Sequence, residues 1–294
     1  MSQTEWGSLR AHIPPVTRPF LKWAGGKGQA FPILRQYLPP LTGGQTYFEP
    51  FLGGGAVFFA LQPKAAVLSD LNGPLIATFE AVMDTPSELA MAIRRIGEPQ
   101  GEEQYYELRK RFNRLVARRE KASTEDRLNC AALFIWLNHT CYNGLHRVNQ
   151  QGEFNVPYGF CQKPFIFSEP QLKAASKALR EADVLLLESD YEKVLSRAVR
   201  GDLAYLDPPY EPVSATASFT NYTREGFDGE EQERLSKVVH ELVERGCRVV
   251  LSNSPSPRIL ELYKGFRTAR VLVPRAINSV GSRRMKVDEL VVVA

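Results

Sequence analysis

The sequence predicts an α/β protein built around a doubly wound sheet with a mostly helical insert. Short apolar runs typical of strands alternate with helical patterns, a glycine-rich turn follows an early strand, and one internal stretch lacks the alternation. The runs expected as later strands lie at residues 184–187, 203–206, 249–251, 271–273 and 290–293. Strands separated by helices in this way form a sheet covered on both faces.

The first unit covers residues 46–70. Residues 46–65 have the pattern of a strand, a glycine turn and a helix, and the apolar run 66–70 ends in Asp70. This order is the start of a βαβ unit. The best-marked helix comes later. We expect it to begin at the N-cap Asp228, with Glu231 completing a capping box, and to end near Arg245 with Gly246 as the C′ residue.

The alternation stops between residues 86 and 168. A helical pattern covers residues 126–138, and a segment rich in Gly and Asn follows at 141–164, with a hairpin turn expected at 149–152. We therefore expect residues 1–85 and 169–294 to form one α/β domain, and residues 86–168 to form a smaller domain inserted in it.

Composition narrows the class of protein. The 294 residues suffice for one large domain and a small one. The four cysteines are scattered without metal-binding spacing, so we expect no metal and a reducing compartment. An excess of 37 basic over 33 acidic residues says little about nucleic acid. No run resembles a signal peptide or a membrane span, so we expect a soluble, monomeric, cytoplasmic protein.

The first chemical motif is the glycine run at residues 48–56, FEPFLGGGA. Glycines between a strand and a helix let backbone amides approach a ligand, and Asp70 at the end of the next strand can accept hydrogen bonds from ribose hydroxyls. A nucleoside-containing cofactor fits this pattern. A plain turn is the alternative, and an NAD enzyme is disfavoured because the run is not G-x-G-x-x-G.

The second motif, residues 206–210 (LDPPY), follows an apolar strand. The lone pair of an exocyclic amine is delocalised into its ring, which makes the amine a poor nucleophile. Two acceptors for its N–H groups would favour the reactive form and the developing positive charge. The Asp207 carboxylate and the Pro208 carbonyl can be those acceptors, and Tyr210 offers a ring on which a base can stack. A rigid turn without chemistry is the alternative.

A third run, FLKWAGGK at residues 20–27, precedes both motifs. Trp23 could stack on the adenine of a cofactor, and Lys27 could reach a carboxylate. An ordinary surface loop with a buried Trp explains the run equally well.

Together the three runs resemble the Dam family of bacterial and phage DNA adenine-N6 methyltransferases (α-class, D12-type). Shorter matches lie at residues 137–138, 142–145, 152–157, 214–217 and 286–290. The resemblance implies a class I methyltransferase fold with S-adenosylmethionine as cofactor. It also implies double-stranded DNA as substrate, a flipped adenine methylated at N6, the target GATC, and residues 86–168 as the target-recognition domain. We expect the protein at the nucleoid of a bacterial or phage-infected cell.

Site residues follow from the same resemblance. The catalytic group is Asp207, Pro208, Pro209 and Tyr210. The cofactor pocket is expected to include Trp23, Lys27, Phe48, Glu49, Pro50, Gly53, Gly55, Asp70, Asp190 and Asp207. Base edges would be read by Lys22, Leu145, Arg147 and Pro157, with Tyr142 inserted into the base stack and Asn143 beside it. Arg109, Asn149 and Asn155 would contact phosphates.

Two positions depart from the family pattern. His139 and Phe160 stand where relatives often carry Arg, which we expect to reduce positive charge at the DNA face. A basic run at residues 109–121 is a solvated helix face, part of which could follow phosphates. His12, His146 and His240 show no catalytic spacing.

Three alternatives stay open at this point. An N4-cytosine methyltransferase could use the same Asp-Pro-Pro motif, although such enzymes more often have Ser in its first position. A protein or ribosomal RNA methyltransferase is disfavoured because the insert resembles a DNA reader. A DNA-binding regulator without catalysis is disfavoured by the intact Asp70 and Asp207.

Overall fold

A computed structural model of the protein describes residues 17–160, 167–211, 227–274 and 286–294. The predicted match at 214–217, the end of the segment 141–164, His12 and Cys161 lie outside these ranges.

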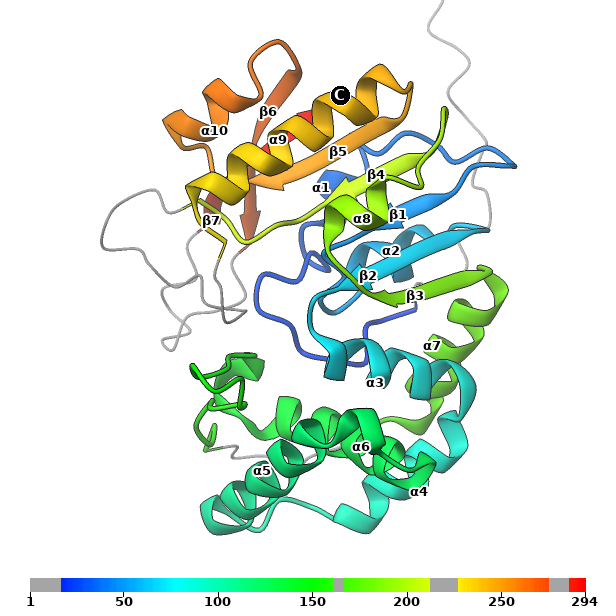
Figure 1. The fold of residues 1–294 in the computed structure, drawn as a ribbon, viewed down its shortest axis with the longest axis vertical. Coiled ribbons are helices and arrows are strands. Elements are labelled where there is room, and N and C mark those ends of the chain that lie inside the picture. The colour runs from blue at the N-terminus through cyan, green and yellow to red at the C-terminus, as the bar shows by residue number, and fades with distance from the viewer. Residues whose placement is uncertain (1–16, 161–166, 212–226, 275–285) are drawn as a thin grey trace, which may run out of the picture.

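A seven-stranded sheet with the order β3-β2-β1-β4-β5-β7-β6 forms the centre of the fold (Figure 1). The parallel strands are β1 (Tyr47–Glu49), β2 (Ala66–Asp70), β3 (Val184–Glu188), β4 (Leu203–Leu206) and β5 (Arg248–Asn253). The last strand, β7 (Lys286–Val293), lies antiparallel between β5 and β6 (Arg267–Pro274). Every apolar run expected as a strand is therefore a strand of this sheet.

Alternate residues of the central strands face opposite sides of the sheet. Tyr47 and Leu68 belong to one buried cluster, whereas their neighbours Phe48 and Val67 belong to a second. The first cluster is covered by α2 (Ala56–Leu61), α3 (Gly73–Asp84) and α7 (Glu169–Glu181), and the second by α8 (Tyr191–Leu195), α9 (Gly229–Glu244) and α10 (Pro257–Leu262). The prediction of a doubly wound sheet is confirmed.

The insert forms a helical lobe beside the sheet. Its helices are α4 (Pro86–Ile96), α5 (Glu102–Ala117) and α6 (Thr124–Thr140), with the short helices η1 (Arg119–Lys121) before α6 and η2 (Tyr142–Gly144) after it. In Figure 1 the lobe lies below the sheet, and α6 packs against α3, α4 and α5. Its apolar residues belong to the same cluster as one face of the sheet. The lobe is therefore held to the sheet by apolar packing, and its independence as a domain stays a prediction.

The ends of α9 agree with the sequence except for one bond. Asp228 accepts hydrogen bonds from the amides of Glu230 and Glu231, and Gly246 follows the helix at φ 82°. The Glu231 carboxylate does not complete the predicted box, because it accepts hydrogen bonds from Tyr191 and Arg234 instead. Two charged or polar partners on the protein surface compete successfully with one backbone amide.

The hairpin predicted at residues 149–152 is present. The Asn149 amide donates to the Glu153 carbonyl at 2.9 Å, and the Asn149 side-chain oxygen accepts from the amides of Gln151 and Glu153. Gly152 has φ 80°, a conformation that residues with a Cβ atom rarely adopt. The turn holds the strand-like segments on either side of it, where Val148 pairs with Phe154.

His139 lies between the lobe and the segment that begins the described chain. Its Nε2 atom is 3.0 Å from the Phe20 carbonyl, so this nitrogen carries the proton and donates. Burial lowers the pKa of His139 to about 4. The side chain is therefore neutral and directed into the protein, and it affects the dependence of stability on pH.

We expect His139→Gln to flatten the dependence of stability on pH. The folded protein binds a proton at His139 only near pH 4, whereas the unfolded chain binds it below about pH 6.5. Between these values the wild-type free energy of unfolding decreases as pH falls, by up to about 1.4 kcal/mol per pH unit from this group. Glutamine can still donate to Phe20 but does not titrate. Urea unfolding of both proteins at pH 7 and pH 5 tests this, and equal losses of stability would contradict it.

Candidate active site

The candidate site lies where neighbouring parallel strands end. β1, β2 and β4 are adjacent in the sheet, and the chain continues from β1 toward one edge and from β4 toward the other. Ligands in doubly wound folds bind at such a switch point, at the carboxyl ends of the strands. The glycine run follows β1, Asp70 ends β2, and Asp207 follows β4. Topology alone thus brings the first two motifs together.

The glycine turn is fixed by Asp70. One carboxylate oxygen accepts from the Gly53 amide and the other from the Asn72 amide, each at 3.0 Å. Burial raises the pKa of Asp70, and the backbone amides around it lower the pKa. A carboxylate oxygen has two acceptor sites, so Asp70 can hold the turn and still accept from a ligand hydroxyl.

Gly53 cannot be replaced without moving Trp23. It has φ 47°, and a Cβ atom there would lie 2.6 Å from the indole nitrogen of Trp23. The third motif therefore packs directly on the first. Trp23 is half-buried beside the turn, and its stacking on a bound base stays a prediction.

Lys27 and Asp207 form the central ion pair of the site. Their side chains meet at 2.7 Å, and the Lys27 ammonium also donates to the Gly25 carbonyl and lies 5.1 Å from the centre of the Tyr210 ring. The Lys27 side chain is 5% exposed and that of Asp207 is 20% exposed, so Asp207 is the member that faces the outside. Burial raises the pKa of Asp207, and Lys27 and then Tyr210 lower it.

Glu49 makes two buried hydrogen bonds that could not be predicted from the sequence. It is 3% exposed, and its Oε2 atom accepts from the Tyr47 hydroxyl at 2.9 Å and from the Phe58 amide at 3.1 Å. Burial raises the pKa of Glu49 to about 8. The carboxyl group therefore links β1 to the first turn of α2, and these two elements flank the glycine turn.

Three other expected cofactor residues differ in their surroundings. Phe48 is buried in the core on the far side of the strand, and Pro50 is buried in the turn. Asp190 lies at the same edge of the sheet, where it caps α8 and pairs with Arg234 at 2.6 Å. The surroundings of Phe48 and Asp190 give each of them a role in the fold.

The Asp-Pro-Pro-Tyr turn is supported by two buried amides. Gln232 donates to the Pro209 carbonyl at 2.9 Å, and Asn253 donates to Gln232 and accepts from the Glu211 amide. Both side chains are 0% exposed. A polar Gln on the apolar face of α9 is the one signal that could have identified this support.

Lys22 and Asn138 join the third motif to the helical lobe. Asn138 accepts from the Lys22 amide at 2.8 Å and donates to the Lys22 carbonyl at 2.7 Å. Lys22 also donates from its ammonium to the His139 carbonyl at the end of α6. Gly144, at φ 63°, packs on Lys22, where a Cβ atom would lie 2.5 Å from that of Lys22.

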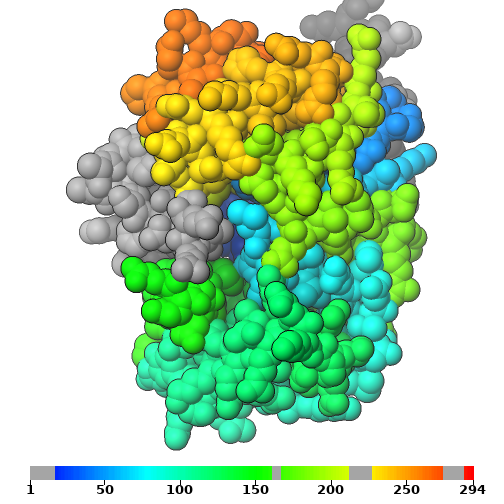
Figure 2. Space-filling model, viewed as in Figure 1, coloured from blue at the N-terminus to red at the C-terminus, as the bar shows by residue number. Residues whose placement is uncertain are grey.

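The expected base-reading residues gather on one rim of the lobe. The Tyr142 amide donates to the Pro157 carbonyl at 2.9 Å, and the Asn155 amide donates to the Arg147 carbonyl at 3.1 Å. These bonds align the segments 142–147 and 155–157. Exposed side chains on the rim are those of Lys22, Tyr142, Asn143, Arg147 and Pro157, whereas Leu145 is half-buried. In Figure 2 the lobe forms the lower part of the molecule, and the sheet with the helices that cover it lies above.

Residues expected at phosphates are engaged inside the lobe. Arg109 donates to the Val156 carbonyl at 3.0 Å and lies over the Tyr106 ring. Asn149 holds the hairpin turn, and Asn155 accepts from Nε of Arg147 at 2.8 Å. Contact with phosphate therefore stays a prediction for these residues, and each has a structural role as well.

The described residues hold neither a metal site nor a membrane span. Within these ranges no group of His, Cys, Asp and Glu side chains is arranged to hold a metal ion. None of the helices seen here is long and apolar enough to cross a membrane.

Comparison with known proteins agrees with this geometry. The family model of the D12 class N6 adenine-specific DNA methyltransferase matches residues 23–278. The chain is 38% identical over 275 residues to the Type II methyltransferase M1.LlaDCHI of Lactococcus lactis subsp. cremoris, covering 94% of each. It is 39% identical over 282 residues to the Type II methyltransferase M.MjaIII of Methanocaldococcus jannaschii, covering 91% of this chain and 95% of that protein. It is 36% identical over 275 residues to the DNA adenine methylase of Escherichia coli, covering 93% and 94%.

Proposed function

This chain belongs to the D12 class of N6 adenine-specific DNA methyltransferases, and from that membership we propose that it methylates a flipped-out adenine in GATC with S-adenosylmethionine as donor. The observation that carries the proposal is the Lys27–Asp207 pair at 2.7 Å, because it joins the third motif to the second at the switch point of the sheet. A stiff turn without chemistry would not need a buried ammonium on its carboxylate.

The residues around the glycine turn fit the proposed cofactor. S-adenosylmethionine supplies an electrophilic methyl group when bound. Asp70 can accept from ribose hydroxyls and Trp23 can stack on the adenine ring, and Gly53 lets the Trp23 ring pack directly on the turn where a Cβ atom would block it. The Lys27 ammonium is the positive charge that we propose for the carboxylate end of the molecule, while it also holds Asp207.

Asp207 and Pro208 are the proposed acceptors for the target amine. Lys27 and Tyr210 lower the pKa of Asp207 and so favour its carboxylate form, whereas burial raises that pKa. Gln232 occupies the Pro209 carbonyl and fixes the turn, so that the carbonyl of Pro208 can be aimed at the second N–H. As the methyl group arrives, both acceptors stabilise the positive charge that develops on the amine.

The position of these groups supports the proposal of base flipping. Asp207 lies at the ends of buried strands and its partner Lys27 is nearly inaccessible, so a paired base in a duplex could not reach it. Extruding the adenine costs a few kcal/mol. Tyr210 could offset part of that cost by stacking, and Tyr142, which is 41% exposed on the rim, could fill the gap left in the duplex.

We propose further that the protein acts on duplex DNA in the cytoplasm and that it does so as a monomer.

GATC is the proposed target, with Arg147 as a direct reader of guanine. Asn155 holds Nε of Arg147, which leaves the terminal amino groups to bond O6 and N7 of one guanine. Such a contact discriminates by roughly 1 to 3 kcal/mol. A phosphate contact would instead affect all sequences alike.

We expect wild-type protein to methylate a GATC duplex faster than every single-base variant, with N6-methyladenine as product. Arg147→Ala should relax this preference at one outer base pair, by about 5- to 150-fold. Rates of methyl transfer from labelled cofactor at fixed salt, with nucleoside analysis of the product, test both points.

Arg111→Ala is the matched control, since Arg111 is an exposed arginine on α5. It should leave the ranking of sequences unchanged. A uniform fall for Arg147→Ala would refute base reading, a wild-type preference for another sequence would refute GATC, and N4-methylcytosine as product would refute the target base.

A further inference from the structure

His146 lies between the proposed DNA reader and the proposed cofactor pocket. It directly precedes Arg147 in the chain, yet its ring stacks on Trp23, with centroids 5.9 Å apart and planes at 17°. On the lobe side it packs on Phe134 at 5.6 Å and Phe154 at 5.5 Å. One imidazole thus contacts the pocket and the lobe at the same time.

A second contact leads from His146 toward Asp70. The side-chain nitrogen of Asn72 lies 3.3 and 3.2 Å from the two ring nitrogens of His146. The backbone N–H of Asn72 donates to Asp70 at 3.0 Å. The side-chain oxygen of Asn72 caps α3 by accepting from the backbone N–H of Leu75. Of the two residues proposed to hold the cofactor, Trp23 therefore contacts His146 directly, and Asp70 is linked to it through Asn72.

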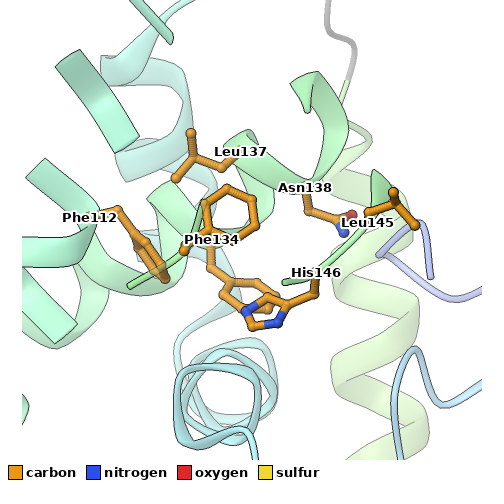
Figure 3. A pocket seen from close by; sticks show the side chains of 7 residues that line it. Phe112, Phe134, Leu137, Asn138, Leu145 and His146 are labelled. Carbon is orange, nitrogen blue, oxygen red and sulfur yellow. The ribbon is translucent and has the colours of Figure 1, made fainter. Parts of the chain in front are cut away.

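The ring is neutral and is held by directed contacts. Burial lowers the pKa of His146 to about 4, so at neutral pH one ring nitrogen can accept from the Asn72 amide group. A cavity of about 10 Å³ lies beside the ring, lined also by Phe112, Leu137, Asn138 and Leu145 (Figure 3). The cavity leaves the lobe side of the ring incompletely packed. The stack on Trp23 and the contact with the side-chain amide of Asn72 therefore set the position of the ring.

We propose that His146 is a positioning residue that couples the cofactor pocket to sequence reading. A ligand that orders Trp23 and Asp70 also fixes the His146 ring, and with it the backbone that presents Arg147. By linkage, DNA that engages Arg147 must then tighten cofactor binding by the same factor. This inference rests on the proposed function, because it takes Trp23 and Asp70 as cofactor contacts and Arg147 as a base reader.

The coupling is measured as a ratio of dissociation constants. S-adenosylhomocysteine is titrated into the protein alone, with a saturating GATC duplex, and with a duplex of equal length that lacks GATC. We expect the GATC duplex to tighten its binding to wild-type protein by about tenfold or more relative to the other duplex. His146→Ala should bring this ratio below about threefold, with a smaller change in affinity without DNA.

Three further variants separate coupling from loss of structure. His146→Phe keeps a ring for the Trp23 stack, and His146→Gln keeps an acceptor for Asn72, so each should retain part of the ratio even if the alanine variant fails to fold. His240 also packs on an aromatic ring, Phe266, but lies on α9. His240→Ala should keep the full ratio.

The proposal is overturned if His146→Ala keeps the wild-type ratio of dissociation constants. It is also overturned if wild-type protein that methylates GATC binds S-adenosylhomocysteine equally tightly with both duplexes. Failure of the proposed function is a separate outcome, because wild-type protein would then not methylate the GATC duplex in the same preparation.

Discussion

Asp207→Ala is expected to lower the rate of methyl transfer by at least about 10²-fold at saturating cofactor, with DNA binding largely kept. Its carboxylate is the proposed charged acceptor for the target amine, and removing one group that stabilises a developing charge costs about 10² to 10³ in rate. Asp207 is not on the rim that carries the exposed residues proposed to contact DNA. Single-turnover methylation and a gel-shift titration on one GATC duplex measure the two effects.

Two controls make this result specific. The substitution leaves the buried Lys27 ammonium without its carboxylate, so the melting temperature and the circular dichroism spectrum must show that the variant is folded. Asp207→Asn keeps an uncharged acceptor of the same shape and should lose less activity than the alanine variant. If folded Asp207→Ala kept more than a few per cent of wild-type turnover, Asp207 would not be the acceptor.

Lys27→Met is expected to move the acid limb of the pH–rate profile to higher pH. Burial raises the pKa of Asp207, and Lys27 is the largest influence that lowers it, ahead of Tyr210. The ionised carboxylate stabilises the developing positive charge better than the protonated group does, so activity is highest above the pKa of Asp207 and is lost as pH falls through it. Without the ammonium that pKa rises, and the rate at a fixed pH on the acid limb should fall about tenfold for each pH unit by which the limb moves.

Lys27→Arg separates charge from shape. Arginine keeps a positive charge near Asp207, so its acid limb should stay close to that of the wild type even if its maximal rate is lower. A profile of Lys27→Met that is reduced equally at every pH would contradict this role for Lys27 and leave it only a contact of the cofactor. Lys27 also lowers the pKa of Glu49, which burial raises to about 8, and Lys27→Arg keeps this influence as well.

The sheet and its site could be predicted because they depend on local patterns. Each parallel strand is a short apolar run, and residues that end such strands meet at one edge whatever their distance in sequence. Asp70, Gly53 and Asp207 were found in this way, since a turn glycine and an acid at the end of a strand are visible in the sequence itself. The two clusters that cover the sheet follow from the same alternation.

The missed residues depend on contacts between distant segments. Gln232 and Asn253 support the Asp-Pro-Pro-Tyr turn from α9 and β5, and Asn138 holds Lys22 from 116 positions away. His146 had no spacing that pointed to Trp23 or Asn72, so it was assigned no role. Arg109 and Asn149 show the opposite case, because a basic or polar residue near a segment expected to bind DNA can instead stabilise the fold.

The most direct test of the account is a crystal structure of the protein with S-adenosylhomocysteine and a GATC duplex. We expect the adenine outside the helix, with its exocyclic nitrogen about 2.7 to 3.2 Å from both the Asp207 carboxylate and the Pro208 carbonyl, and the cofactor between Trp23 and Asp70. An adenine that stays stacked in the duplex, or an amine that faces groups other than these two, would contradict the account.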